Sequence, residues 1–408
     1  MSNKGTPFFI SLFLVFILLL YTYNLGFPPE RYFDEVYHAR RASQLALEGR
    51  FDPRSSTHPP LWHYAGALAI KCFGNFPYIW RIPSVVCGLI NIYLVYMLAG
   101  ILFPGRFIAM CAAVLFALDG MSLTQARISM LNSMTLMFML LSVICFLKYY
   151  YQRHWPARKG LMWAGIFTGL AMATKLSSVF ILILFFGIFL FDLVKGQKPH
   201  RFSIFQFLLY FCFIPFFIFM FVYLLIPLLG LASFSQLLSH FEWSYKGLVL
   251  ERGHRYGSLW WSWPLMLRPI WYYYKNIDGV VQGILCIGNP AVFWLIPGAF
   301  FVTVYKLVRQ KIWGYGFILL MFLTQWLPYA LVSRVQFFHY FYFVMPAACM
   351  MIALLLHHLW KDASYGRFLA IVYLGCVVVM FIYWYPLLNG TPIPHSFYKS
   401  HMWFRPWI

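Results

Sequence analysis

Charge is scarce in this sequence. Only 10% of the 408 residues are charged and only 11 are acidic, whereas 62% are hydrophobic. A soluble globular protein carries about 25% charged and about 45–50% apolar residues. The composition therefore excludes a soluble globular chain, and it leaves no stretch polar enough for a sizeable soluble domain.

Several sequence signals are missing as well. The eight cysteines form no C-x-x-C pair and mostly lie in apolar runs, so we interpret them as small buried residues. No H-E-x-x-H motif and no internal repeat occurs. We therefore predict no cofactor and no metal ligands, although the sequence leaves a divalent metal open. The net charge of +20 is spread over loops between apolar runs. This pattern argues against nucleic acid and favours lipid headgroups and a phosphorylated substrate as partners.

Apolar runs are what the sequence has in abundance. Many are about 20 residues long, which is the length of a membrane-spanning helix, and they lack the short alternating segments of a barrel. We therefore predict an all-α, polytopic membrane protein with about eleven transmembrane helices. The expected spans are residues 8–26, 82–103, 107–122, 127–147, 161–174, 176–193, 204–229, 288–305, 312–331, 343–360 and 368–385.

The short loops on one side of these spans are almost purely basic. They contain Arg106, Lys148, Arg153, Arg158, Lys159, Lys195, Lys198, Arg201, Lys306, Arg309, Lys311, Lys361 and Arg367. An excess of Lys and Arg marks cytoplasmic loops. We therefore expect a cytoplasmic N-terminus and an extracytoplasmic C-terminus, in an integral membrane protein.

The two longest loops, residues 27–81 and 230–288, fall on the outer side and mix charges, aromatic residues and prolines. Most of the carboxylates also fall on that side: Glu30, Asp34, Glu35, Glu48, Asp52, Asp119, Glu242, Glu251 and Asp278. Because carboxylates are so scarce elsewhere, we predict that this face carries the active site. The chain then forms a single membrane-embedded domain over residues 1–408.

Two adjacent carboxylates, Asp34 and Glu35, follow the first expected span. Holding such a pair at a membrane boundary is costly, which favours a functional role over a solvated loop. Adjacent side chains diverge, so we expect separate roles, with one accepting a proton and the other holding the loop. Further along, His58 precedes a stiff Pro59-Pro60 step. It either faces the pocket or bonds to backbone in a turn.

Four cations lie at the outer ends of expected spans: Arg81, Arg127, Lys175 and Arg334. One such residue alone is usually an anchor at the membrane interface. Four on the face that holds the carboxylates favour a site for the phosphate of a donor. The candidate pocket takes in the outer-side residues His58, His254, Arg268, His339 and Tyr340. The tryptophans between His254 and Arg268 either form an interfacial belt, which we favour, or stack on a sugar.

A series of motifs resembles the protein O-mannosyltransferases, which have the GT-C fold of membrane glycosyltransferases that use polyprenyl-phosphate sugars. The resemblance runs in order along nearly the whole chain. It rests on F-D-E at 33–35, H-P-P-L at 58–61, L-D-G-x-x-x-T-Q-A-R-x-x-x-L-N-S at 118–133, W-S-W-P-L-M-L-R-P at 261–269, G-N-P-A-V-F-W at 288–294, F-F-H-Y-F at 337–341 and the final residues 401–408.

The resemblance implies that Asp34 is the catalytic base and that Glu35 and Arg81 support it. The sequence departs from the family pattern in three places. Trp62 and His63 follow Leu61 where the family commonly has Gly-Lys, and Asn132 replaces an acid. The second outer loop is also too short for the soluble β-trefoil insert of eukaryotic members. These features resemble a bacterial-type enzyme of the inner membrane.

The implied reaction is an inverting transfer of a mannosyl or related hexosyl residue from a polyprenyl-phosphate sugar to Ser or Thr hydroxyls of a protein. A phosphate-linked sugar already has a good leaving group, so one base and a few cations suffice. A lipid A or glycan glycosyltransferase of the same fold remains an alternative. A lipid-linked sugar transporter or flippase fits less well, because it would show charges near span midplanes and symmetry between halves.

Overall fold

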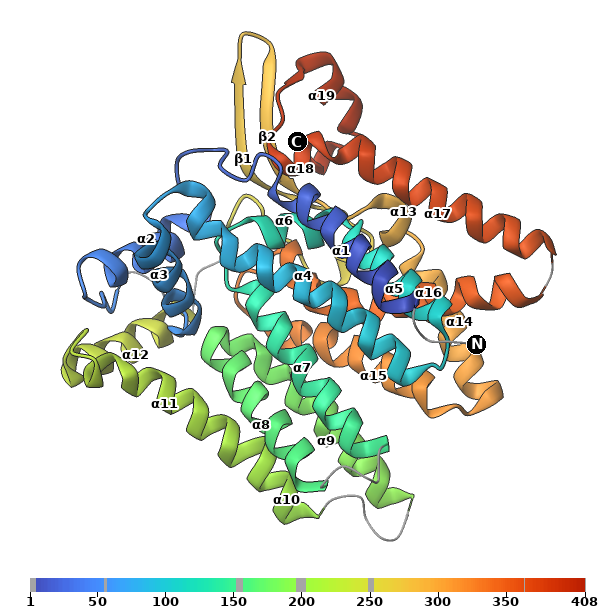
Figure 1. Ribbon diagram of the computed structural model, residues 1–408, viewed down its shortest axis with the longest axis horizontal. Helices are drawn as coiled ribbons and strands as arrows, with labels where there is room; N and C mark the ends of the chain where they lie inside the picture. Colours follow the sequence, from blue (N-terminus) through green and yellow to red (C-terminus); the bar gives the residue numbers. More distant parts are fainter. Residues whose placement is uncertain are drawn as a thin grey trace. The chain divides into compact units, whose positions relative to one another are not determined.

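The computed structural model describes residues 5–54, 57–151, 157–195, 203–248, 253–362 and 364–407 (Figure 1). Glu251 and the loop residues Arg153, Lys198 and Arg201 lie outside the described residues. The chain divides into two compact units. The first unit comprises Met1–Phe33, Ser84–Ile128 and Glu251–Ile408, and the second comprises Asp34–Pro83 and Ser129–Leu250.

The described residues contain eight helical segments that are long and apolar enough to cross a membrane, or nine if a bent pair counts as one span. The bent pair is α5 (Arg106–Ala117) with α6 (Gly120–Arg127), at an angle of 62°. The eight are α4 (Pro77–Leu102), α7 (Asn132–Tyr151), Leu176–Val194, Ile204–Leu228, Pro290–Gln310, Trp313–Leu331, Phe338–Lys361 and Tyr365–Trp384.

These segments confirm a helical, multi-pass membrane protein. The expected count of about eleven spans stays a prediction. Two helices occupy the places of the first and fifth expected spans, namely α1 (Gly5–Thr22) and α8 (Ala157–Thr174), but neither is among the eight.

The first unit is organised around α16 (Met345–Asp362), which packs against α5, α14 (Ile296–Gln310), α15 (Trp313–Trp326) and α17 (Ser364–Trp384). In the most apolar stretch of the Phe338–Lys361 segment, which contains α16, 89% of the residues are buried, so this segment forms the interior of the unit. Shorter elements complete the unit: α13 (Pro290–Phe293), α18 (Pro386–Asn389), α19 (His395–His401), η3 (Trp260–Ser262), η4 (Leu327–Leu331), η5 (Phe338–Val344) and η6 (Arg405–Trp407).

The first unit also contains a small sheet that the sequence reading as all-α did not anticipate. Strands β1 (Ile270–Ile277), β2 (Val280–Cys286) and β3 (Ile393–Pro394) pair antiparallel in the order β1-β2-β3. Asp278 and Gly279 join β1 to β2, and both have positive φ, at 48° and 80°. Two residues of positive φ form the turn that matches the twist of a hairpin. Figure 1 shows this hairpin with α19 beside it.

The second unit is a bundle in which α8 packs against α7 and against α11 (Ile214–Leu228). Two glycines of α8 allow a close approach, because a Cβ at Gly165 would overlap the carbonyl oxygen of Tyr210, which precedes α11, and one at Gly169 would lie 2.8 Å from the Pro215 carbonyl oxygen of α11. Small residues four apart let membrane helices approach in this way. The bundle also contains η1 (Leu176–Phe180), α9 (Ile181–Val194), α10 (Ile204–Leu208) and η2 (Leu209–Phe213).

Three helices of the second unit lie outside the candidate spans: α2 (Glu35–Leu47), α3 (Leu61–Phe73) and α12 (Phe234–Leu248). Helices α2 and α3 pack against each other. A core cluster of Leu45, Phe51, Tyr223, Ile226 and Leu237 joins α2 and α12 to α11. Burial of these side chains fixes the place of α2, whose N-cap and first residue are the two adjacent carboxylates.

Candidate active site

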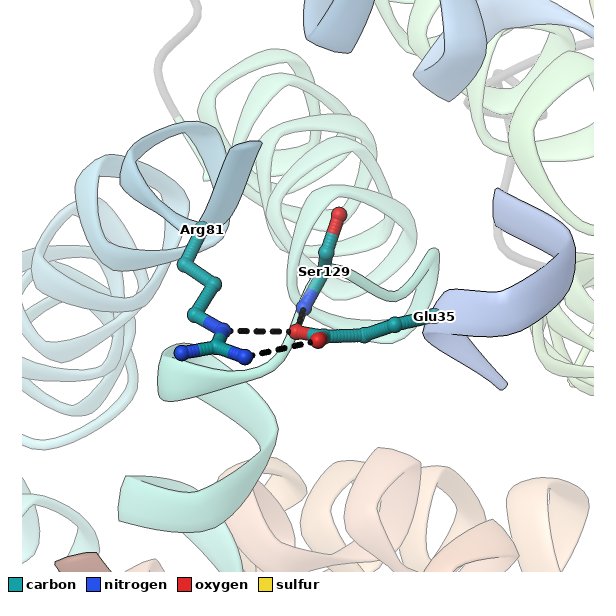
Figure 2. A network of polar contacts seen from close by, with 3 residues as sticks. All are labelled: Glu35, Arg81 and Ser129. Carbon is teal, nitrogen blue, oxygen red and sulfur yellow. Dashed lines mark hydrogen bonds and ion pairs between the residues drawn. The ribbon is translucent and has the colours of Figure 1, made fainter. Parts of the chain in front are cut away.

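The first residue of α2, Glu35, forms a buried ion pair with Arg81 (Figure 2). The Nε and Nη2 atoms of Arg81 each donate to one Glu35 oxygen at 2.9 Å. The backbone N–H of Ser129 donates to Glu35 Oε1, also at 2.9 Å. Both charged side chains are at most 1% exposed.

This geometry ties together three segments that are far apart in the sequence. Glu35 comes from α2, Arg81 from α4 and Ser129 from the segment before α7. A bidentate guanidinium–carboxylate pair is both stronger and more directional than a single hydrogen bond. Glu35 is therefore held in one orientation, which suits a residue that supports a neighbour rather than one that exchanges a proton.

Asp34 stands at the N-cap of α2 and is half-buried. Its backbone carbonyl accepts the N–H groups of Tyr37 and His38, both at 3.0 Å, and so begins the helix. Its side chain makes no capping hydrogen bond. The two adjacent carboxylates thus differ in environment, as expected of a pair with separate roles.

The residue before Asp34 has an unusual backbone. Phe33 has a φ of +49°, which is a left-handed conformation that costs a non-glycine residue free energy. Its ring stacks on the Tyr272 ring, with centroids 4.2 Å apart, and packs edge-to-face with the His339 ring, with centroids 6.0 Å apart. The Tyr272 hydroxyl is in turn bonded to the Gln125 side chain. These contacts belong to the first unit and hold Phe33 in its strained conformation.

Two buried histidines, His38 and His63, and the partly buried His58 form a group that begins one helical turn after Asp34. The Nδ1 atom of His38 is 3.1 Å from the Nε2 atom of His63, and the ring of His58 lies 5.5 Å from that of His38. Burial, and then the nearby cations Arg41 and Lys175, lower the pKa of His38 to about 3. Burial also lowers the pKa of His63 well below its ordinary value. The two rings are therefore neutral, and one donates its proton to the other.

Arg41 of α2 holds the loop that follows this helix by bonding to its backbone. Its Nη2 atom donates to the Asp52 carbonyl at 2.8 Å, its Nη1 atom donates to the His58 carbonyl at 3.4 Å, and its guanidinium lies over the Phe51 ring. Burial lowers its pKa to about 10, so it stays charged at neutral pH. The backbone of His58 thus has a structural contact, while its ring faces the histidine group.

The four predicted phosphate-binding cations have different surroundings. In the second unit, Arg81 pairs with Glu35, and the buried Nζ atom of Lys175 donates to Asn132 at 2.8 Å. In the first unit, Arg127 donates to the carbonyls of Tyr21 and Tyr23 at the end of α1, at 2.6 and 2.7 Å. Arg334 is half-buried in the first unit. Their joint role in phosphate binding stays a prediction.

The other predicted pocket residues all lie in the first unit. His339 is buried against Phe33 and Tyr272, and Tyr340 stacks on Tyr329 at 5.4 Å. The exposed His254 accepts the Tyr256 N–H, while Arg268 donates to the Arg255 carbonyl. Among these residues, only His339 contacts the residue that precedes Asp34.

Sequence reasoning missed three features of the site: the His38–His63 pair, the bonding of Arg41 to the loop after α2, and the aromatic wall at Phe33. Their partners are separated along the chain by 10 positions, for Arg41 and Phe51, to 306 positions, for Phe33 and His339. Within the described ranges, no group of three or more His, Cys, Asp or Glu side chains could hold a metal ion.

Two family models together match nearly the whole chain. A family model described as dolichyl-phosphate-mannose-protein mannosyltransferase matches residues 11–237. Another, described as the C-terminal four TMM region of protein-O-mannosyltransferase, matches residues 231–407. A polyprenol-phosphate-mannose–protein mannosyltransferase from Mycolicibacterium smegmatis is 24% identical, over 94% of this chain and 89% of its own length.

Solved structures with the same fold cover almost all of the chain. The Saccharomyces cerevisiae protein O-mannosyltransferase Pmt1-Pmt2 complex bound to the sugar donor has a matching chain with a TM-score of 0.84 and 14% identity, covering 100% of this chain and 93% of that one. ArnT from Cupriavidus metallidurans bound to undecaprenyl phosphate matches with a TM-score of 0.65 and 15% identity, covering 95% and 77%. These likenesses confirm the predicted GT-C fold.

Proposed function

We propose a function from one premise that the two family matches establish: this chain belongs to the protein mannosyltransferase family. Its function is to transfer a mannosyl residue from a polyprenyl-phosphate-linked donor to Ser or Thr hydroxyls of proteins. The name of the mycobacterial relative supports both the donor and the acceptor class. The observation that carries the proposal is that the matches together span residues 11–407.

Asp34 is the general base of the transfer. As the acceptor hydroxyl oxygen attacks the anomeric carbon of the sugar, Asp34 takes its proton, and the bond from that carbon to the phosphate oxygen breaks. The phosphate leaves as an anion, so no acid is needed on the leaving side. Direct attack opposite the phosphate inverts the anomeric carbon.

Glu35 and Arg81 position this base. Two Arg81 nitrogens and the Ser129 N–H hold Glu35, which neutralises the carboxylate next to Asp34 in the sequence. A second uncompensated negative charge there would raise the pKa of the base and disfavour its ionised form. Lys175 of the same unit stabilises the departing phosphate, because its Nζ atom donates to the neutral Asn132 side chain, whereas the charge of Arg81 is already paired with Glu35.

The protein works in a bacterial inner membrane with Asp34 on the extracytoplasmic side and the N-terminus in the cytoplasm. The basic short loops support this orientation. A C-terminal alkaline phosphatase fusion should be active and a fusion after residue 198 inactive. The opposite pattern would place Asp34 in the cytoplasm and contradict the orientation.

The test of function uses purified protein, radiolabelled polyprenyl-phosphate-mannose and a Thr-containing peptide. Asp34→Asn should lower transfer by about 100-fold or more, as expected for loss of a general base. Glu30→Gln is the matched control, because Glu30 is an exposed carboxylate near Asp34 in the sequence, and its side chain accepts a hydrogen bond from the Tyr273 hydroxyl. Its activity should stay near wild type. Normal turnover by Asp34→Asn would refute the assignment of the base, and label appearing in lipid A or a glycan but never in peptide would refute the acceptor.

A further inference from the structure

The hairpin of β1 and β2 has one free edge. In the sheet order β1-β2-β3, strand β2 is central and its far side is covered by β3, so β1 is the edge strand. Within the described part of the chain, no other strand pairs with β1. Its outer half, from Tyr274 to Ile277, is exposed. Figure 1 shows α19 on the β2 side of the hairpin.

The register shows which backbone groups point away from β2. Ile277 pairs with Val280 across the two-residue turn, so these two residues exchange hydrogen bonds. Bonded and non-bonded pairs alternate along an antiparallel ladder. Tyr274 and Asn276 are therefore in non-bonded pairs, opposite Gly283 and Val281. Their N–H and C=O groups face the free edge.

This edge leads to Phe33, the residue that precedes the proposed catalytic Asp34 in the sequence. Two residues inward from Tyr274, the ring of Tyr272 stacks on Phe33 at 4.2 Å, and Phe33 immediately precedes Asp34. Two strand residues cover about 7 Å. An extended chain lying along Tyr274–Ile277 therefore ends beside the aromatic residues that fix the start of the catalytic segment.

We propose that the free edge of β1 binds the acceptor polypeptide as an added strand, through the backbone groups of Tyr274 and Asn276. The proposal rests on the proposed function. Main-chain hydrogen bonds recognise an extended peptide whatever its side chains. Such recognition suits an acceptor defined chiefly by a Ser or Thr hydroxyl.

The size of the edge favours a transient substrate over a second copy of this chain. Stable protein–protein interfaces bury about 1,200–2,000 Å², and four exposed residues supply far less. Charged side chains also flank the edge, with Lys275 in the strand and Asp278 in the turn. Charges at an edge strand discourage pairing between identical sheets.

A proline substitution tests the backbone directly. Asn276→Pro removes an N–H that faces outward and leaves the bonds to β2 in place, since proline is tolerated at such edge positions. The matched control, Asn276→Ala, removes the side chain and keeps the N–H. We expect Asn276→Pro to raise the KM for a peptide acceptor roughly fivefold to tenfold, as loss of a hydrogen bond predicts. Its kcat and its KM for the donor should match those of Asn276→Ala.

A second arm uses the wild-type protein and does not depend on the folding of a variant. A series of peptides contains one Thr each. Each peptide carries one backbone N-methyl group, and the position of that group moves by one residue from peptide to peptide. Pairing with an edge uses alternate residues, so KM should rise and fall with a period of two. This alternation should disappear in Asn276→Pro. A KM for Asn276→Pro equal to that of Asn276→Ala, or an N-methyl series without alternation, would overturn the proposal.

The outcomes separate the two proposals. If wild-type protein labels no peptide, the proposed function fails and the edge proposal fails with it. If it labels peptides but the alternation is absent, only the edge proposal fails. If Asn276→Pro converts a dimer to a monomer in light scattering, the edge pairs with a second copy, and the acceptor proposal is wrong.

Discussion

Two buried carboxylates, Glu35 of the second unit and Asp119 of the first, are held in different ways. In the second unit, Glu35 is paired with the charged Arg81 side chain, and the titratable side chains of His38 and His63 bond to each other. In the first unit, the buried Asp119 accepts backbone N–H groups, from Ser122 at 2.9 Å and from Asn289 at 2.8 Å. Arg127 of that unit likewise donates to backbone carbonyls.

This difference indicates that Asp119 has a structural role and that the Glu35–Arg81 pair serves the chemistry. Asp119 joins the start of α6 to the segment before α13, and the Asn289 side chain continues the contact to the carbonyls of Leu118 and Val377. These bonds fix where elements turn. A buried ion pair, in contrast, gives little net stability relative to a well-packed apolar replacement. The Glu35–Arg81 pair next to Asp34 is therefore better explained by its effect on Asp34 than by stability.

The largest expected effect comes from breaking this ion pair. Glu35→Ala leaves the Arg81 charge buried without its carboxylate, which should destabilise the protein by about 3–5 kcal/mol. Unfolding by SDS measures the change.

The double variant Glu35→Leu with Arg81→Met provides the control. Removing both charges should restore most of the lost stability, because an apolar pair of similar volume is often neutral or stabilising. The double variant should nevertheless remain inactive in mannosyl transfer. Recovery of activity along with stability would show that the pair serves folding alone.

A smaller effect is expected from the backbone-bonded carboxylate of the first unit. Asp119 accepts two backbone N–H groups, those of Ser122 and Asn289. In Asp119→Asn the amide oxygen still accepts one of them, but the amide NH2 group, which is a donor, faces the other. One buried N–H then lacks a partner, at a cost of about 1–3 kcal/mol. SDS unfolding should show this loss while the KM for the donor stays unchanged. A loss of donor affinity without a loss of stability would place Asp119 in the chemistry and remove the contrast between the units.

The sequence predicted a helical, multi-pass membrane protein because a membrane helix is a local signal, a run of apolar residues of fixed length. The hairpin had a local signal too. Asp278-Gly279 between Ile277 and Val280, after the aromatic residues 271–274, is the composition of a two-residue hairpin. The expectation of an all-α protein made no use of this turn signal and therefore did not include the sheet.

The site was less predictable because its contacts are long-range. The sequence does not distinguish an arginine that anchors a helix at the membrane interface from one that caps the end of a distant helix. Arg127 shows this, since its carbonyl partners Tyr21 and Tyr23 lie 106 and 104 positions away. The resemblance to the family implied that Glu35 and Arg81 support Asp34, and the structure shows that they bond to each other across 46 positions. No periodicity in the sequence connects His38 with His63.

The smallest expected effect concerns this histidine pair and tests whether the second unit depends on titratable groups. Because its folded-state pKa is about 3 against an ordinary 6.5, His38 binds a proton more weakly in the folded than in the unfolded protein. Its contribution is therefore fully present above pH 6.5 and is lost as the pH falls from 6.5 towards 3. Between pH 7.5 and 6.0 the loss is about 1 kcal/mol.

SDS unfolding at these two pH values should show a lower stability at pH 6.0. His63 adds to the loss in the same direction, since burial lowers its pKa too. The cations Arg41 and Lys175 and the ring of His58 also face His38 and stay in place in the variant His38→Gln. That variant should lose less stability on acidification than wild type, whereas His254→Gln, which changes an exposed histidine of the first unit, should lose as much as wild type. An unchanged loss in His38→Gln would mean that the buried pair does not set the pH dependence, and that the second unit is no more sensitive to protons than the first.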